Sequence, residues 1–256
     1  MIKFKKSLGQ NFLKNEMIAD EIVAAADLSK KDTVLEIGPG AGILTQRLTK
    51  IAGQVFAVEK DFDLVDKLRR GMGQKNLKLI HQDALWFDPS LLGNFKIVAN
   101  IPYNITSAII RTILIATPPA SRAILMVQRE VAQRMIAKAG DMNLLALSVQ
   151  LYGNVRKCFD VAPGSFTPRP NVTSAVIEIT HFTKNNDNRF DPEIVLSFAR
   201  IAFAKKRKLL ASNLAESTPH SKSEIVIILE SCGIRANARA QDLSVRQWID
   251  LASKLQ

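Results

Sequence analysis

The sequence predicts an α/β protein: a mostly parallel sheet of seven strands with an antiparallel pair at one edge, followed by a small all-α region. From about residue 33, short β-rich runs alternate with helical segments, a rhythm typical of a parallel sheet with helices on both faces. Two later β-rich runs are separated only by a proline-rich loop (163–170), which favours antiparallel pairing because a parallel crossover needs a longer connection. After residue 190 every pattern is helical.

Seven β-rich runs supply the expected strands. The parallel part is predicted at 33–37, 54–58, 76–81, 95–99 and 123–127, and the antiparallel pair at 155–161 and 174–180. The intervening helices are expected at 43–51, through Arg70 after the second strand, at 106–116 and at 129–139.

A polar run at 184–189, Lys-Asn-Asn-Asp-Asn-Arg, is typical of a linker. We therefore expect two domains, residues 1–185 and residues 186–256. The second is predicted to consist of helices at 192–203, 205–214, 222–232 and 245–255.

The composition, 47% hydrophobic and 23% charged over 256 residues, is that of a folded globular protein. The longest apolar runs are too short to span a bilayer, and the N-terminus has no apolar core of a secretory signal. Cys158 and Cys232 stand far apart and outside any Cys/His array, which argues against a disulfide scaffold and a zinc site. We therefore expect a cytoplasmic protein with no metal site and no membrane association.

Positive charge predominates, with 35 Lys and Arg against 24 Asp and Glu and a formal net charge of +11. Two stretches carry basic residues and no acid: 1–14, with Lys3, Lys5, Lys6 and Lys14, and 200–208, with Arg200, Lys205, Lys206, Arg207 and Lys208. A single run of this kind is often only a solvated face. Two runs and a high net charge together favour a polyanionic partner.

A glycine-rich loop, Glu36-Ile-Gly-Pro-Gly-Ala-Gly42, lies between the first strand and the first helix of the alternating region. Gly38 and Gly40 allow a sharp turn and a close approach of the backbone to a ligand. The spacing is tighter than in dinucleotide-binding loops, and Pro39 removes one amide donor. These features suit a ligand without a pyrophosphate.

Two acidic residues stand at the ends of the next two strands. Glu59 follows Gly38 by 21 residues, where a carboxylate can accept hydrogen bonds from ribose hydroxyls. Asp83 could accept from the exocyclic amine of an adenine. With the glycine loop, these acceptors predict S-adenosylmethionine as cofactor. The alternative is that each carboxylate caps a helix or solvates a loop.

The fourth strand ends in Asn100-Ile-Pro-Tyr103. Because ligands gather at the carboxyl ends of parallel strands, this tetrapeptide should face the cofactor. The Asn100 side-chain oxygen and the carbonyl of Ile101 or Pro102 can accept from a planar amine, and Tyr103 offers a face for a base. Such a transfer depends on positioning and needs no nucleophilic side chain. The alternative is an ordinary strand-end turn.

These motifs resemble the small-subunit rRNA adenine N6,N6-dimethyltransferases of the KsgA type and, more distantly, the erythromycin-resistance rRNA methylases. The resemblance covers nearly the whole chain. It is carried by the segments 8–13, 36–42, 58–60, 82–84, 100–103, 126–132, 166–174 and 203–209. It implies a Rossmann-like, class I methyltransferase fold with a helical RNA-binding domain.

The resemblance also implies roles for individual residues. Phe166 is expected to pack against the target adenine opposite Tyr103, although the usual burial of phenylalanine predicts a core aromatic at this position. The implied catalytic residues are Asn100, Pro102, Tyr103 and Phe166, and the implied cofactor contacts are Asn11, Leu13, Gly38, Gly40, Glu59, Asp83 and Asn100.

The implied substrate is a pair of adjacent adenosines in the 3′-terminal hairpin loop of 16S rRNA in the immature small ribosomal subunit, modified by a monomeric enzyme. Two alternatives remain open. The acceptor could be adenine in DNA or glutamine in a protein, since similar tetrapeptides present those planar amines. The chain could also act without catalysis, as an RNA-binding assembly factor.

Overall fold

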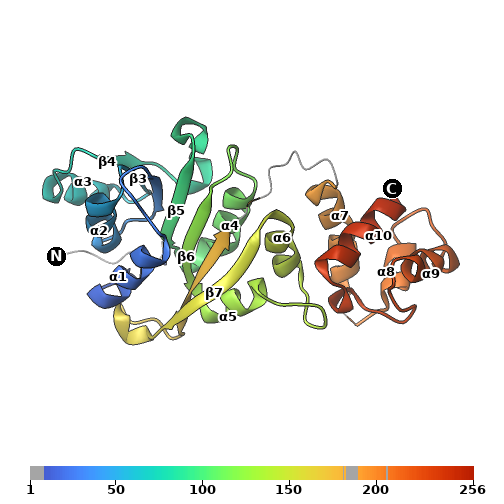
Figure 1. Ribbon diagram of the computed structural model, residues 1–256. Helices are drawn as coiled ribbons and strands as arrows, with labels where there is room; N and C mark the ends of the chain where they lie inside the picture. The colour runs from blue at the N-terminus through green and yellow to red at the C-terminus, as the bar shows by residue number, and fades with distance from the viewer. Residues whose placement is uncertain (1–8, 181, 183–189, 206) are drawn as a thin grey trace. The chain divides into compact units, whose positions relative to one another are not determined.

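The computed structural model describes residues 9–180, 182, 190–205 and 207–256 (Figure 1). Its contacts divide the chain into two compact units. The first contains the residues up to 132 together with 154–182, and the second contains 133–153 together with the residues from 183 onward.

A seven-stranded sheet forms the centre of the first unit, in the order β4-β3-β2-β5-β6-β9-β7. The strands β2 to β6 are parallel to their neighbours, and β9 and β7 close one edge in antiparallel pairing. Their bounds are β2 Thr33–Ile37, β3 Gln54–Glu59, β4 Leu77–His81, β5 Phe95–Asn100, β6 Arg122–Gln128, β7 Asn154–Val161 and β9 Ser174–Thr180. The predicted fold class and sheet are therefore confirmed.

Helices cover this sheet as the alternating pattern predicts. They are α1 Glu16–Ala25, α2 Ile43–Ile51, α3 Phe62–Gly71, α4 Thr106–Leu114 and the start of α5 Arg129–Met135. Apolar residues of α1 and α2, among them Ile22 and Leu48, pack against the buried face of β2, β3, β5 and β6. A separate two-stranded ribbon pairs β1 (Phe12–Leu13) with β8 (Phe166–Thr167).

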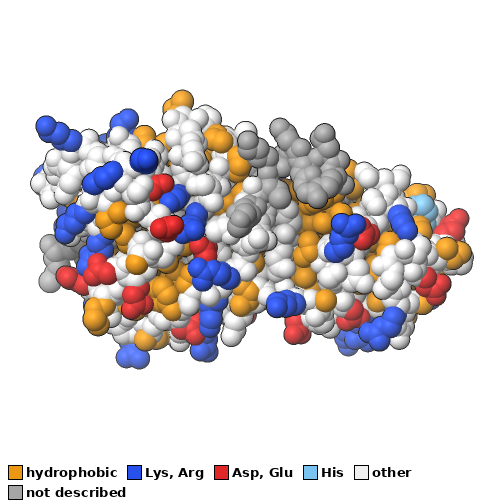
Figure 2. Space-filling model, viewed as in Figure 1, with side chains coloured by type: hydrophobic (Ala, Val, Ile, Leu, Met, Phe, Trp, Pro, Cys, Tyr) orange, Lys and Arg blue, Asp and Glu red, His pale blue; other side chains and the backbone are white. Residues whose placement is uncertain are grey.

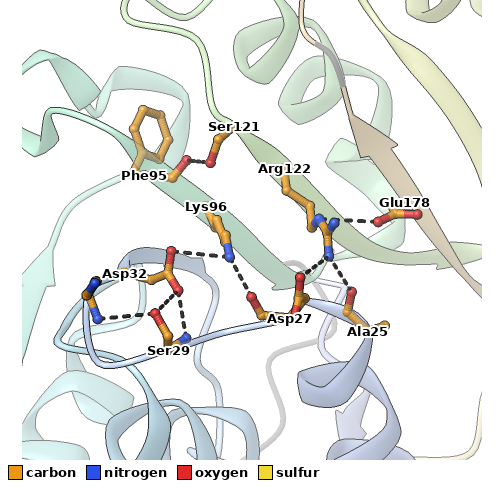
Figure 3. Close-up of polar contacts among 10 residues, drawn as sticks. Ala25, Asp27, Ser29, Asp32, Phe95, Lys96, Ser121, Arg122 and Glu178 are labelled. Carbon is orange, nitrogen blue, oxygen red and sulfur yellow. Dashed lines mark hydrogen bonds and ion pairs between the residues drawn. The ribbon is translucent and has the colours of Figure 1, made fainter.

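Polar contacts fasten the amino ends of β5 and β6 to the connection between α1 and β2 (Figure 3). Lys96 donates to the carbonyl of Asp27 at 2.5 Å and lies 3.2 Å from an Asp32 oxygen. Arg122 donates to the carbonyl of Ala25 at 3.4 Å and lies 3.3 Å from the buried carboxylate of Glu178. These contacts lie at the amino end of the sheet, opposite the carboxyl end at which ligands of such sheets gather.

The second unit is helical, with α7 Pro192–Ala204, α8 Leu210–Ala215, α9 Lys222–Ser231 and α10 Val245–Leu255. It also holds α6 (Leu144–Tyr152), which packs against α7 and α10. The sequence pattern does not predict this helix. The segment is apolar almost throughout and shows no amphipathic period, yet Asn143 caps it by accepting from two backbone N–H groups. The predicted boundary near residue 185 lies outside the described residues.

Helix α8 begins later than predicted, at Leu210 instead of residue 205. The buried Asn213 side chain donates to the carbonyls of Ala202 and Lys205 and so satisfies two acceptors at the end of α7. In the parts of the chain that the structure describes, no helix combines the length and the apolar character needed to cross a lipid bilayer.

Candidate active site

A cleft lies at the carboxyl ends of β2, β3 and β5, where the strand-end motifs converge. It has an empty volume of about 800 Å³, part of it open to solvent. Most of the predicted site residues line it: Asn11, Leu13, Gly38, Gly40, Glu59, Asn100, Pro102 and Tyr103. Asp83 and Phe166 are not among the lining residues.

The glycine loop forms one wall of the cleft, and the amides of its three glycines donate within the protein. The N–H of Gly38 donates to the Val58 carbonyl at 2.9 Å, and that of Gly42 donates to the Pro39 carbonyl at 2.9 Å. The N–H of Gly40 donates to a Glu59 oxygen at 3.2 Å. A phosphate needs several free amides at such a loop, so this loop suits the phosphate-free ligand that the sequence predicts.

Gly38 and Gly40 both have positive φ, +69° and +57°, a region that other residues rarely adopt. A Cβ on Gly40 would lie 2.8 Å from the ring of Phe12. The loop and the N-terminal segment therefore meet at van der Waals distance. Phe12 was not predicted as a site residue, although it lies within the motif at 8–13.

Glu59 is the acidic group of the cleft. It is 9% exposed, and it accepts from the N–H groups of Gly40 and Asp61, the latter at 2.9 Å. Burial raises the pKa of Glu59, and these two backbone hydrogen bonds oppose the rise. Each carboxylate oxygen keeps a second lone pair, so Glu59 can still accept from ligand hydroxyls.

Asp83 lies beside Lys60, which lines the cleft and was not singled out from the sequence. The Lys60 ammonium is 2.8 Å from one Asp83 oxygen, and the other oxygen accepts from the N–H of Leu85. The ammonium lowers the pKa of Asp83. The role of Asp83 as an adenine acceptor stays a prediction.

The Asn100 amide has a defined orientation. Its Nδ2 donates to the backbone carbonyl of Asn11 at 3.1 Å, which leaves Oδ1 as the acceptor that can face a ligand. The Asn11 carbonyl thus sets which end of the amide is presented.

The second acceptor of the tetrapeptide can be chosen from the hydrogen bonds. The Pro102 carbonyl accepts from the N–H of Ile105 and from the Thr106 hydroxyl, both at 3.2 Å. The Ile101 carbonyl makes no hydrogen bond to the described residues. This favours Ile101 over Pro102 as the partner of Asn100.

The two predicted aromatic residues differ in exposure. Tyr103 lines the cleft and is half-buried, whereas Phe166 is 1% exposed and packs in the hydrophobic core with Leu13, Val161 and Val176. The structure agrees with the expectation of a core aromatic at Phe166. Its contact with a substrate base stays a prediction.

The N-terminal segment borders the cleft and is fastened at several points. Gln10 donates to Asp61 at 2.9 Å, Phe12 and Leu13 pair with Thr167 and Phe166, and the N–H of Lys14 donates to the Ser165 carbonyl. These partners lie about 50 to 150 residues away along the chain, so no local pattern in the sequence predicts the contacts.

Part of the second predicted basic stretch is paired within the protein. Lys205 and Lys208 both bind the exposed carboxylate of Glu216, and these contacts lower its pKa to about 2. Lys3, Lys5, Lys6 and Lys206 lie outside the described residues. On the face drawn in Figure 2, Lys and Arg side chains are interspersed with Asp and Glu.

The chain is similar to known proteins along nearly its whole length. The family model for ribosomal RNA adenine dimethylases matches residues 1–256. The chain is 42% identical over 252 residues to the ribosomal RNA small subunit methyltransferase A of Dehalococcoides mccartyi, with 96% of this chain and 87% of the relative covered. It is 39% identical over 271 residues to the protein of the same name from Trichormus variabilis, with 100% and 99% covered.

Two solved structures share the fold across both units. A dimethyladenosine transferase from Plasmodium falciparum superposes with a TM-score of 0.81 at 28% identity, covering 94% of this chain and 95% of that one. The 23S rRNA methyltransferase ErmE superposes with a TM-score of 0.75 at 27% identity, covering 96% and 99%. With a family match along its whole length and relatives at 39–42% identity, the chain belongs to the ribosomal RNA adenine dimethylase family.

Proposed function

We propose that this protein transfers methyl groups from S-adenosylmethionine to N6 of two adjacent adenosines in the 3′-terminal hairpin loop of 16S rRNA, giving N6,N6-dimethyladenosine. The single observation that carries the proposal is the oriented Asn100 amide: its Oδ1 makes no hydrogen bond to the described residues, and Asn100 lines the same cleft as Ile101 and Tyr103. The reaction belongs to small-subunit biogenesis, and we propose that the enzyme acts as a cytoplasmic monomer.

The residues of the cleft fit the proposed cofactor. When bound, S-adenosylmethionine supplies an electrophilic methyl group. Its ribose hydroxyls suit the free lone pairs of Glu59, and its lack of phosphate suits a loop whose three glycine amides donate within the protein. We propose that the cofactor is held by Asn11, Leu13, Gly38, Gly40, Glu59, Asp83 and Asn100.

The protein's own contribution is to hold the adenine amine in a reactive geometry. The amine of adenine is a weak nucleophile because its lone pair is delocalised into the ring. Accepting both N–H bonds, at Asn100 Oδ1 and at the Ile101 carbonyl, favours a pyramidal nitrogen whose lone pair points away from these acceptors. Tyr103 stacks on the base and holds it in the cleft.

An RNA loop is the acceptor that this cleft suits best, because loop bases are already unstacked and can enter without opening a duplex. Tritium transfer from labelled cofactor to rRNA, to DNA and to protein tests the proposal directly. Label in rRNA adenosine supports it. Label in DNA or in protein glutamine, with none in rRNA, would replace it with one of the other acceptors.

Lys205 and Lys208 are proposed to bind RNA phosphates in place of Glu216. Changing both to Ala should weaken RNA binding. It should also reduce the steepness of the plot of log binding constant against log salt concentration by about one to two. Glu216→Gln should tighten RNA binding, because it frees the ammonium groups of Lys205 and Lys208 from their partner within the protein. Both are measured by binding a hairpin RNA at several salt concentrations.

The exposed basic residues Lys222 and Arg235 of the same unit provide the control. Changing both to Ala removes the same formal charge and should leave the slope near the wild-type value. An equal loss of slope in the control would show that net charge matters and that the pair at Glu216 has no special part.

A further inference from the structure

The hydroxyl of Tyr103 is anchored to a residue far away in the sequence. Tyr103 Oη lies 2.5 Å from Ser174 Oγ, and Ser174 is fully buried, with 0% exposure. Burial raises the pKa of Tyr103, so the phenol keeps its proton and the contact is a hydrogen bond between neutral groups.

Ser174 occupies a rigid place in the sheet. It is the first residue of β9, where it pairs with Gln128 of β6 on one side and with Val161 of β7 on the other. Its backbone is therefore held by two neighbouring strands. The backbone of Tyr103 is held as well, because its carbonyl and that of Pro102 share the Thr106 hydroxyl, which lies 3.2 Å from each.

This contact gives a role to the last residue of the 166–174 motif, which the sequence analysis singled out without assigning its serine a function. We propose that Ser174 is a positioning residue that fixes the ring of Tyr103 against the cleft, so that a substrate base meets a preset stacking surface. The inference rests on the proposed function, because it takes Tyr103 to be the surface on which the base stacks.

A ring whose hydroxyl is held in place loses little freedom when a base stacks on it, whereas a ring without this contact must be ordered at each turnover. Removing the Ser174 hydroxyl should therefore slow methyl transfer without altering cofactor affinity. Ser174 acts only through the tyrosine hydroxyl, so removing that hydroxyl should have the same effect.

A double-mutant cycle on kcat tests the inference. Ser174→Ala and Tyr103→Phe should each lower kcat by about tenfold, and the double variant should be no slower than either single variant. The affinity for S-adenosylmethionine should stay within about twofold of wild type in all three. Independent, multiplying losses in the double variant would overturn the inference.

Ser121→Ala is the matched control for removing a serine hydroxyl. Ser121 donates to the Phe95 carbonyl at 3.0 Å at the opposite end of the sheet (Figure 3). It should leave kcat unchanged. A loss of melting temperature in Ser174→Ala without a loss of kcat would mean that Ser174 serves stability alone, and it would also overturn the inference.

A readout without catalysis separates this inference from the proposed function. The chain has only two tyrosines, Tyr103 and Tyr152, so 3-fluorotyrosine labelling gives two ¹⁹F resonances that Tyr152→Phe assigns. Ser174→Ala should shift the Tyr103 resonance and narrow it as the ring becomes free. An unchanged Tyr103 resonance in Ser174→Ala would overturn the inference, even if the wild-type enzyme methylates RNA. If the wild-type enzyme methylates no RNA, the proposed function is wrong, and the ¹⁹F spectrum alone then tests whether Ser174 positions Tyr103.

Discussion

Replacing Asn100 by Ala is expected to lower the rate of methyl transfer to RNA by about 10²–10³-fold, the usual effect of removing a preorganised hydrogen-bonding group from an active site. The affinity for S-adenosylmethionine should fall far less, by less than about tenfold, since most of the residues proposed to hold the cofactor remain. The reason is specific to this geometry. The Asn11 carbonyl binds Asn100 Nδ2 and leaves Oδ1 as the group that accepts from the amine.

Single-turnover kinetics on a hairpin RNA, together with calorimetric titration of the cofactor, measures both quantities. Asn100→Asp should fall between Ala and wild type, because a carboxylate keeps an acceptor but cannot donate to the Asn11 carbonyl. Asn94→Ala, at the exposed amino end of the segment leading into β5, is the control and should be fully active. An Asn100→Ala enzyme with near wild-type rates would show that Asn100 does not present the amine.

The second large effect concerns stability. Glu36 of β2 is 1% exposed, so its carboxyl group is almost completely removed from water. Burial is the main cause that raises the pKa of Glu36 from 4.5 to about 8. The charge of Glu59 contributes to this rise, and hydrogen bonding with Thr45 opposes it. At neutral pH the folded protein therefore holds a proton that the unfolded chain releases.

The direction of the pH dependence follows from this difference. Because the folded state binds the proton more tightly, stability falls as pH rises through the window from 4.5 to about 8. Protonated Glu36 contributes its full stabilisation of the folded state below pH 4.5, and this stabilisation is lost above pH 8. The loss from this group should be on the order of 3–5 kcal/mol across the window.

Glu36→Gln keeps the shape of the side chain and removes the titration. In urea unfolding at pH 5, 7 and 9, this variant should lose much less stability than wild type toward high pH and should be the more stable protein at pH 9. Glu21→Gln, on the exposed side of α1, is the matched control and should follow wild type. If wild type and Glu36→Gln lost stability in parallel, the buried carboxyl group would not be the cause.

Much of the fold could be predicted because its signals are local. The alternation of β-rich and helical runs fixes each strand of the central sheet to within a few residues, and the proline-rich loop at 163–170 separates the antiparallel pair. Helix α6 could not be predicted because it is apolar almost throughout, so its sequence shows no helical alternation of apolar and polar residues. Its place in the helical unit depends on packing against α7 and α10.

The candidate site was predictable only in part for a related reason. Strand-end motifs predict that Gly38, Glu59 and Asn100 line one cleft, because parallel strands end at the same edge. The contacts that orient these groups join distant segments, as Asn11 does for Asn100 and Ser174 does for Tyr103. No pattern in the sequence reports such pairs, and they appear only when the chain is folded.

The most direct test of the account is mass spectrometry of nucleosides from small ribosomal subunits that lack the modification, after incubation with the wild-type protein and S-adenosylmethionine. We expect N6,N6-dimethyladenosine at two adjacent positions of the 3′-terminal hairpin loop, and none after incubation with the Asn100→Ala protein. Unmodified adenosines at both positions, or methyl groups only at other sites, would contradict the account.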